Sequence, residues 1–240
     1  MKTLHICTLL IFFSLGFAQK KSGIAIYKVT PIQENHDKKD AFSMLKNQAG
    51  NLFGFISYNL YFSPTASLFS IDEKMKTDVS DRQQELALIM AGRGKYYTQK
   101  NKDSLLYQTI FEGDLFLISR SSKNTLWKIT TEKKIINGFE CLKAIGRHKP
   151  YGHKSDYEVV AWFTPKLNLP YGPREFSGLP GLILELEEKA YGNIYYCTQI
   201  NFDETVTFEK PNKGIKMSEV AFQKYAEEKA NEFFRLGGGD

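Results

Sequence analysis

Short apolar runs, separated by polar or glycine-bearing connections, dominate the chain from Tyr96 to Phe208. Alternating apolar positions rich in β-branched and aromatic residues are typical of strands. No strand in this part alternates with a helical pattern, so an antiparallel sheet is favoured over parallel βαβ units. The predicted strands span residues 96–99, 105–111, 115–119, 127–130, 139–147, 157–164, 182–187, 194–202 and 205–208.

The N-terminal part of the chain adds three predicted strands. Residues 24–29 are rich in β-forming side chains, and Pro31 ends this first strand. Residues 58–62 and 68–71 flank a short connection that contains Pro64, which predicts a hairpin. Together with the later strands, this pattern predicts an α+β, mainly β fold built on a curved antiparallel sheet with the shape of half a barrel.

Three segments show helical spacing of their apolar residues. Residues 40–56 form one helix, a candidate insertion, although Gly50 and Gly54 weaken its end. Residues 81–90 predict a short second helix, and residues 217–235 predict a terminal one. We expect one or two of these helices to pack on one face of the sheet. The terminal helix is expected to carry on its apolar side Val220, Tyr225 and Phe233.

Composition agrees with a folded chain and excludes several classes of protein. Of 240 residues, 42% are hydrophobic and 25% charged, while 18 glycines and 8 prolines follow no fixed period. These values exclude disorder, collagen and coiled coil. Aromatic residues make up 14% of the chain, which fits half-buried pleated surfaces. The net charge of +5 comes from 32 basic and 27 acidic residues spread evenly, so no nucleic-acid partner is expected.

The N-terminus shows the three-part pattern of a secretory signal. Lys2 provides a positive start, an apolar stretch follows, and Gly16 and Ala18 are the small residues that a signal peptidase recognises. Because a spanning helix needs about 20 apolar residues, cleavage is favoured over a membrane anchor. We predict a signal peptide over 1–18, a single domain over 19–240, a periplasmic or secreted location, and no integral membrane segment after cleavage.

Export would leave Cys141 and Cys197 in a compartment where a disulfide can persist. In a simple meander of four strands, these two cysteines lie three strand spacings apart, about 14 Å. A disulfide needs Cα atoms within about 7 Å of each other, so a bridge requires a closed or rearranged sheet. A disulfide and two separate thiols therefore both remain open.

A loop rich in proline and glycine, between Trp162 and Leu186, is the most informative segment. Proline fixes φ and glycine permits positive φ, so the loop can hold a defined shape without regular hydrogen bonds. Pro180 and Gly181 suit the second and third positions of a type II turn. The loop either docks a partner or forms a folding corner, and its lack of reactive groups favours the corner. One face of the next strand is expected to carry Leu182, Leu184 and Leu186.

This loop also resembles a known family. The GLPGLI family of Bacteroidetes is named after a motif that resembles Gly178, Leu179, Pro180, Gly181, Leu182 and Ile183. Further resemblance lies in Trp162–Pro165, in Tyr171, Gly172 and Pro173, and in residues 136–144. The resemblance implies an exported protein of a Gram-negative cell envelope, without an established activity or catalytic residues. The strand-rich body is also similar to the half-barrels of periplasmic lipoprotein carriers, an analogy of fold alone.

Catalytic and metal-binding chemistry finds little support in the sequence. His148 and His153, with Asp156, could hold a metal, but neighbouring basic residues oppose cation binding, so a solvated hairpin is favoured. Glu187 and Glu188 lie at a strand end and predict a solvated edge. We find no nucleophile elbow and no phosphate loop. No metal or cofactor is predicted, and an enzyme is not favoured.

Arg174, Glu175 and Phe176 form the charged and aromatic cluster of the loop. An arginine here can bind a carboxylate or phosphate of a partner, or pair with Glu175 or with a nearby strand. The candidate binding residues are Tyr171, Arg174, Phe176 and Trp162. Three functions follow in order of preference: a non-enzymatic binding module for an apolar ligand or peptide, an accessory protein for an outer-membrane receptor or assembly, and a periplasmic hydrolase.

Overall fold

The computed structural model describes residues 22–32, 52–72, 81–150 and 155–237. In these ranges twelve strands form one sheet, in the order β12-β6-β5-β4-β3-β2-β1-β11-β10-β9-β8-β7. Neighbouring strands are antiparallel except β12 and β6, which are parallel. The prediction of a mainly β fold with a curved sheet is confirmed. The strands are β1 (Gly23–Pro31), β2 (Ser57–Phe62), β3 (Ala66–Ile71), β4 (Lys95–Gln99), β5 (Ser104–Phe111), β6 (Asp114–Ser121), β7 (Thr125–Ile136), β8 (Phe139–His148), β9 (Tyr157–Thr164), β10 (Leu182–Glu188), β11 (Asn193–Phe202) and β12 (Ile215–Ser218).

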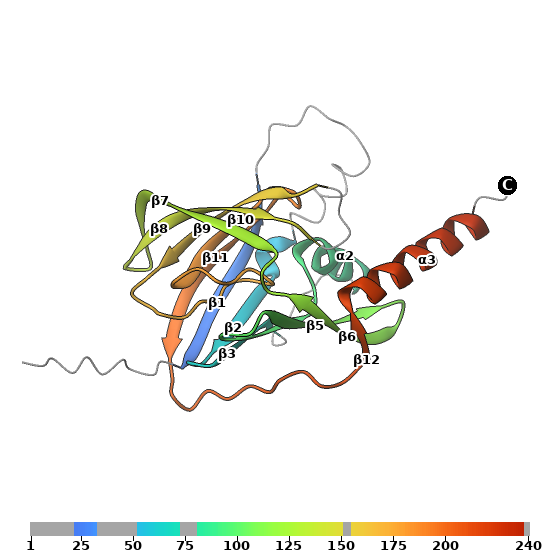
Figure 1. Cartoon of the computed structure of the whole chain (residues 1–240), viewed down its shortest axis with the longest axis horizontal. Coiled ribbons are helices and arrows are strands. Elements are labelled where there is room, and N and C mark those ends of the chain that lie inside the picture. The colour runs from blue at the N-terminus through green and yellow to red at the C-terminus, as the bar shows by residue number, and fades with distance from the viewer. Residues whose placement is uncertain (1–21, 33–51, 73–80, 151–154, 238–240) are drawn as a thin grey trace, which may run out of the picture.

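The sheet curves around a hollow, and two helices lie at its open side (Figure 1). Helix α2 (Asp81–Ala91) is anchored there, because the Ala91 carbonyl accepts hydrogen bonds from the Tyr58 and Tyr195 hydroxyls at 2.8 and 2.6 Å. Helix α3 (Glu219–Gly237) projects away from the body beyond β12. None of the described helices is both long and apolar enough to cross a membrane.

The predicted helix over 40–56 lies mostly outside the described residues. Its described end contains a single 3-10 turn, η1 (Phe53–Phe55). The predicted terminal helix exists, but Met217 belongs to β12. Val220 is 49% exposed, so its expected place on the apolar side is wrong. Tyr225 does pack inward, whereas the side chain of Phe233 is outside the described part.

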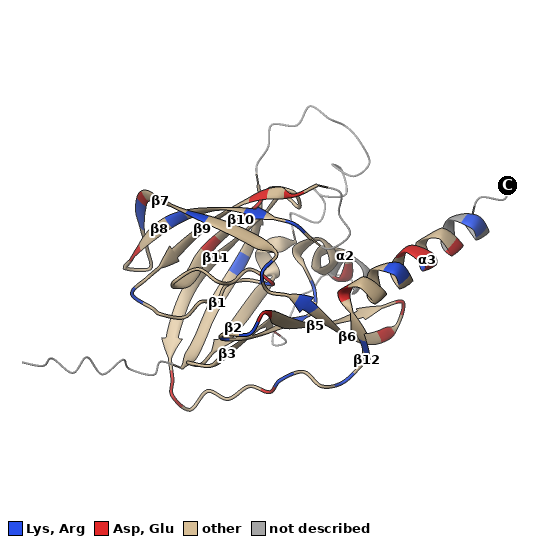
Figure 2. Cartoon of the chain, viewed as in Figure 1, with Lys and Arg blue, Asp and Glu red and all other residues tan. Residues whose placement is uncertain are grey.

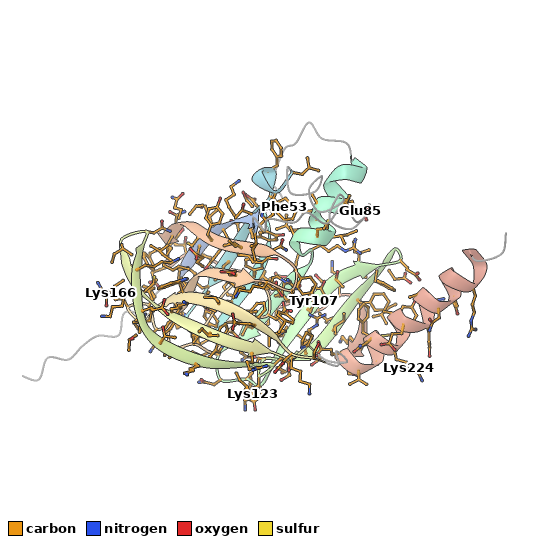
Figure 3. All side chains as sticks on the ribbon, turned by 90° about the horizontal axis from the view of Figure 1, so that it is seen from above. Phe53, Glu85, Tyr107, Lys123, Lys166 and Lys224 are labelled. Carbon is orange, nitrogen blue, oxygen red and sulfur yellow. The ribbon has the colours of Figure 1, made fainter. Side chains whose placement is uncertain are left out.

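Aromatic side chains fill the hollow of the sheet. Tyr27, Tyr58, Phe69 and Tyr195 interlock as stacked and edge-to-face rings with centroids 4.9 to 6.4 Å apart, and none is more than 1% exposed. Such ring pairs contribute about 0.5–1.5 kcal/mol each beyond area burial. Seen from above, side chains crowd the space within the sheet (Figure 3). Much of the aromatic content of the chain therefore serves packing.

The loop between β9 and β10, residues 165–181, folds back into the same hollow. The Ile183 N–H donates to the Tyr171 carbonyl at 2.9 Å, and the Tyr27 hydroxyl donates to the Ile183 carbonyl at 2.6 Å. Buried loop side chains, at most 4% exposed, are those of Leu167, Leu169, Tyr171, Phe176 and Leu179. No exposed surface remains on Leu182, Leu184 or Leu186, but the single face expected for them is interrupted by a register shift between Ile183 and Glu185. The loop thus forms a corner that fills the core.

The turn at the end of this loop differs from the prediction. Gly181 does not have a positive φ, and its N–H donates to the Leu179 carbonyl at 2.8 Å, so the predicted type II turn over Pro180 is wrong. The turn is tighter, with a bond between residues two apart. A Cβ at Gly181 would lie 2.2 Å from the Thr164 carbonyl oxygen. Glycine is needed here for close approach of the two strands, while Gly178 takes the positive φ of 91°.

Residues 203–214, called the strap below, cross the outer face of the sheet from β11 to β12 (Figure 1). The strand predicted over 205–208 is wrong, because these residues pair with no neighbouring strand. Instead, the Phe208 ring packs on Tyr61 and Tyr97 with centroids 6.4 and 6.5 Å away. The strap therefore covers the sheet through side chains, and it delivers β12 to the edge of β6.

Candidate functional site

A cavity of about 260 Å³ lies between the inner face of β4–β6, the ends of β8–β10 and the first turns of α3. Ligand pockets usually measure about 300–1,000 Å³, so this cavity suits a small group or one side chain. Its lining is rich in charged residues, namely Arg120, Arg174, Glu175 and Glu219.

The innermost charged pair of the cavity is tightly bonded. The Arg174 Nη1 donates to Glu188 Oε2 at 2.5 Å, and the Tyr157 hydroxyl donates to Glu188 Oε1 at 2.6 Å. Arg174 holds a φ of 54°, a left-handed conformation that costs free energy for any residue with a Cβ. Gly92 leaves room for it, since a Cβ there would lie 3.3 Å from Arg174 Cδ. Contacts with the surrounding structure therefore hold Arg174 in this strained backbone conformation.

Around this pair, the other charged side chains are loosely paired. Arg120 Nε lies 3.4 Å from Glu219 Oε1, and Arg120 Nη1 lies 3.8 Å from Glu175 Oε1. Arg174 Nε lies 3.3 Å from Glu175 Oε2 without a hydrogen bond. Four buried atoms lack a hydrogen-bond partner here: Arg120 Nε, Arg174 Nε, Glu175 Oε2 and Gln223 Oε1. Because unpartnered buried polar atoms are costly, a polar ligand in the cavity would gain free energy by bonding to them.

In the cavity lining, the two carboxylates of Glu175 and Glu219 face the two guanidinium groups of Arg120 and Arg174. Burial raises the pKa of Glu188, which lies behind the lining, to about 6 against the opposing effect of Arg174. Burial also raises the pKa of Glu219, which Arg120 opposes. Burial alone would raise the pKa of Glu175, but Arg174 and Arg120 outweigh it and lower that pKa. An additional positive charge in the cavity would favour the ionised form of Glu219.

Tyrosine rings form the remaining walls of the cavity. The Arg120 guanidinium lies 4.2 Å from the centroid of Tyr107, which stacks on Tyr96 at 4.5 Å. On the opposite wall, Tyr157 and Tyr191 meet edge to face at 6.0 Å. Ring faces next to carboxylates attract ammonium and guanidinium groups. Charge and rings thus point to the same class of ligand, a cation.

The charged groups of the cavity pair mainly with one another. Glu188, with its pKa near neutral pH, is fully buried and does not line the cavity. In the described part of the chain, no group of His, Cys, Asp and Glu side chains is placed to hold a metal ion. Of the residues considered for a metal, Asp156 accepts a hydrogen bond from Arg147 at 2.9 Å, and His153 lies outside the described residues. What the geometry offers is recognition by charge and aromatic contact.

The four predicted binding residues lie in different places. Arg174 lines the cavity and pairs with a neighbouring strand, which was one of the two alternatives for it. Phe176 is fully buried. Tyr171 is also fully buried, and its hydroxyl has no hydrogen-bond partner. Trp162 lies on the outer face of β9 with Lys134 Nζ 4.3 Å from its ring. The structure therefore separates Trp162 from Arg174.

Sequence reasoning missed two residues of the site. His148 is 2% exposed and lines the cavity, so the expected solvated hairpin is wrong at this position. Glu188 is fully buried, so the expected solvated edge is wrong there. A signal for Glu188 was present, because it continues the alternate positions of Leu184 and Leu186 on the buried face of β10.

Cys141 and Cys197 are separate thiols, both buried. They lie on β8 and β11, the outer strands of the meander β8-β9-β10-β11. Burial raises the pKa of the Cys141 thiol to about 11 and that of Cys197 to about 12. Both sulfur atoms are therefore protonated and packed in the core, with the disulfide alternative unformed.

The fold and site define a mainly β protein with one curved sheet and a charged cavity beneath its C-terminal helix. A family model described as "Protein of unknown function (Porph_ging)" matches residues 146–185, which include the loop and the start of β10. No curated protein matches the sequence.

Among solved structures, those of PNGF-II in the P21 and C2 space groups are similar to this chain, with TM-scores of 0.54 and 0.55. The sequences are 11% identical, so the likeness is one of fold. Each comparison covers 85% of this chain but 32% of the other. This chain therefore matches about a third of the length of PNGF-II.

Proposed function

We propose that this protein is an exported, non-enzymatic binding module whose cavity beneath α3 receives a basic group of a peptide, either a Lys or Arg side chain or an N-terminal ammonium group. The observation that carries the proposal is a cavity walled by tyrosine rings, in which the carboxylates of Glu175 and Glu219 are only loosely paired. A cation pairs with these carboxylates and contacts the ring faces. Glu175 Oε2 and Gln223 Oε1 supply acceptors for its N–H groups.

A peptide fits this module better than an apolar ligand inside the sheet. The hollow of the sheet holds the side chains of the loop over 165–181, including the fully buried Tyr171 and Phe176. The cavity beneath α3 instead offers both signs of charge together with aromatic walls. A peptide supplies matching groups, because its backbone and side chains donate and accept hydrogen bonds around one central cation.

Export and an envelope location belong to the same proposal. They are motivated by the signal pattern of residues 1–18, which lie outside the described residues, and by the resemblance to the GLPGLI family. The match over 146–185 relates the loop to an uncharacterised family of Porphyromonas type. The peptide would then belong to another periplasmic or outer-membrane protein, which includes the accessory role as a special case.

The test is calorimetric titration of the purified chain with three acetylated hexapeptides that differ at one central position, Lys, Met or Glu. We expect the Lys peptide to bind at least about tenfold more tightly than the other two, since one charge-assisted hydrogen bond is worth about this factor. Glu219→Gln removes a carboxylate of the cavity and should weaken the binding of the Lys peptide by a similar factor. Glu228→Gln makes the same change on an exposed part of α3 and should leave binding unchanged.

Equal binding of the three peptides would contradict the proposal. The same conclusion would follow if Glu219→Gln and Glu228→Gln weakened binding equally, because the cavity would then have no special role.

A further inference from the structure

A second cavity lies on the outer face of the same strands, beneath the strap. Successive residues of a strand point to opposite faces. Tyr107 and Arg120 face the charged cavity, whereas Leu106 and Leu117 face outward and line a groove of about 720 Å³. Leu117 is only 6% exposed, because the strap shields this part of the sheet. The size lies within the usual range of about 300–1,000 Å³ for ligand pockets.

The strap is held at both ends of this groove and leaves the middle open. At one end, the Phe208 ring packs on Tyr97. At the other end, Gln108 Nε2 donates to the Lys213 carbonyl at 2.9 Å, and β12 pairs with β6 directly afterwards. Pro211, which lacks an N–H, lies between these anchors and lines the groove. The strap therefore crosses the groove above its apolar side chains without filling the groove.

The rim of the groove is basic. Lys210 and Lys216 both line it, and its lining contains no carboxylate. Within the described chain, no ion pair is formed by either lysine. Figure 2 shows basic positions along the part of the strap that leads into β12. The groove thus combines an apolar floor with two cationic groups at its edge, which is the complement of an anionic amphiphile.

We propose that this groove binds a free long-chain fatty acid. The acyl chain would lie on Leu106 and Leu117 beneath Pro211 of the strap, and the carboxylate would pair with Lys210 and Lys216 at the rim. A single acyl chain suits the groove because the strap crosses it from above, and burial of each methylene is worth about 0.8 kcal/mol. This site faces away from the cavity beneath α3, so it does not depend on the proposed peptide binding.

The experiment uses the full chain and 11-(dansylamino)undecanoic acid, whose fluorescence increases in an apolar site. We expect saturable binding and displacement by palmitic acid below its aggregation concentration. Hexadecanol, which lacks the carboxylate, and hexadecyltrimethylammonium, which has the opposite charge, should displace the probe at least about tenfold less well. Vesicles of phosphatidylglycerol should not displace it, because two-chain lipids in a bilayer do not fit beneath the strap.

Two variants and a control locate the site. Lys210→Glu combined with Lys216→Glu should weaken the binding of palmitic acid by about tenfold or more. Both positions are exposed, so the fold should be retained. Lys128→Glu with Lys166→Glu makes the same change in net charge at exposed positions away from the groove and should have no effect. Leu106→Ser tests the apolar floor and should weaken palmitic acid and hexadecanol alike by about tenfold.

The proposal is overturned if the probe does not bind saturably, if the two lysine pairs behave alike, or if the cationic amphiphile displaces the probe as well as palmitic acid. Displacement by vesicles as strong as that by palmitic acid would also overturn it, since a membrane surface would then be the true partner. None of these outcomes bears on the Glu219→Gln titration of the other cavity.

Discussion

Two regions of the sheet differ in how completely their side chains are packed. In the filled wing, formed by β1, β7–β11 and the loop 165–181, the inward-facing aromatic and leucine side chains are buried, and the Tyr27 hydroxyl donates a hydrogen bond at 2.6 Å. In the hollow wing, formed by β4–β6, β12 and α3, the ion pairs of Arg120 are 3.4 and 3.8 Å long, and a cavity lies on each face.

This difference in packing indicates which wing has room for a ligand. The filled wing supplies its own occupant, the loop that carries the family-like motif, so that motif serves the core. The hollow wing is closed by the strap and by α3, which is a mostly exposed helix with alternating acidic and basic residues (Figure 2). Around the charged cavity, polar atoms without partners come from the hollow wing at Arg120 and Gln223, and from the loop at Arg174 and Glu175. Binding chemistry therefore belongs to the wing that is less completely packed.

The largest expected effect is a loss of stability in the filled wing. Leu182→Ala removes a fully buried side chain, and such changes cost about 2–5 kcal/mol, because lost burial and the remaining cavity both contribute. Leu126→Ala is the matched control on the exposed face of β7, where the leucine is 75% exposed, and it should stay within about 0.5 kcal/mol. Urea unfolding measures both. Similar losses for the two variants would remove the distinction between packed and exposed leucines.

A smaller effect is expected from pH at Glu188. The folded state raises its pKa to about 6 by burial, so between the usual value and 6 the folded chain binds more protons than the unfolded chain. The free energy of unfolding should therefore fall by about 1–2 kcal/mol as pH rises through this window. Glu188→Gln should remove that part of the pH dependence, which is read as the difference between wild type and variant in urea unfolding at pH 4.5 and 7. Parallel pH profiles would contradict it.

Two buried tyrosines of the filled wing offer a finer comparison. Tyr27→Phe deletes a hydroxyl that donates to the Ile183 carbonyl, and it should cost about 1 kcal/mol because a buried hydrogen bond is lost. Tyr171→Phe deletes a hydroxyl without a partner, so it should be neutral or slightly stabilising. Thermal unfolding of both variants gives the answer. A larger loss for Tyr171→Phe than for Tyr27→Phe would show that the packing of this loop is misassigned.

The smallest effect concerns the thiols of Cys141 and Cys197. Since both are free and buried, a reductant should leave the unfolding midpoint unchanged. Non-reducing peptide mapping should also find no crosslink between them. A linked peptide would show that the filled wing closes further than described, through the disulfide that the sequence left open.

Much of the strand pattern was predictable, because a strand with one buried face has apolar residues at alternate positions of its sequence. The hairpin predicted over 58–62 and 68–71 matches β2 and β3 within two residues at each end, and the buried and half-buried residues of β2 alternate strictly. The strap was mistaken for a strand in part because Phe208 and its neighbours are β-forming, although their contacts are with ring faces. The four residues of β12 were too few to show a period.

The candidate site was harder to predict because its members are brought together by the curvature of the sheet. Arg174 was identified from its loop, but its partner Glu188 ends strand β10 and Glu219 begins helix α3. Charged residues at element ends are usually solvated, which is why Glu188 was assigned to a solvated edge. Only the alternation along β10 indicates otherwise. Long-range pairing of opposite charges has no local signature in one sequence.

Amide hydrogen exchange of the chain with and without the Lys hexapeptide tests most directly whether the charged cavity binds a basic group. Binding there should slow exchange at the end of β6 and in the first turns of α3, which wall the charged cavity. Exchange in the loop 165–170 and on β9 near Trp162 should be unchanged. Protection confined to that loop or to the face of Trp162, with none in β6 and α3, would contradict binding in the charged cavity.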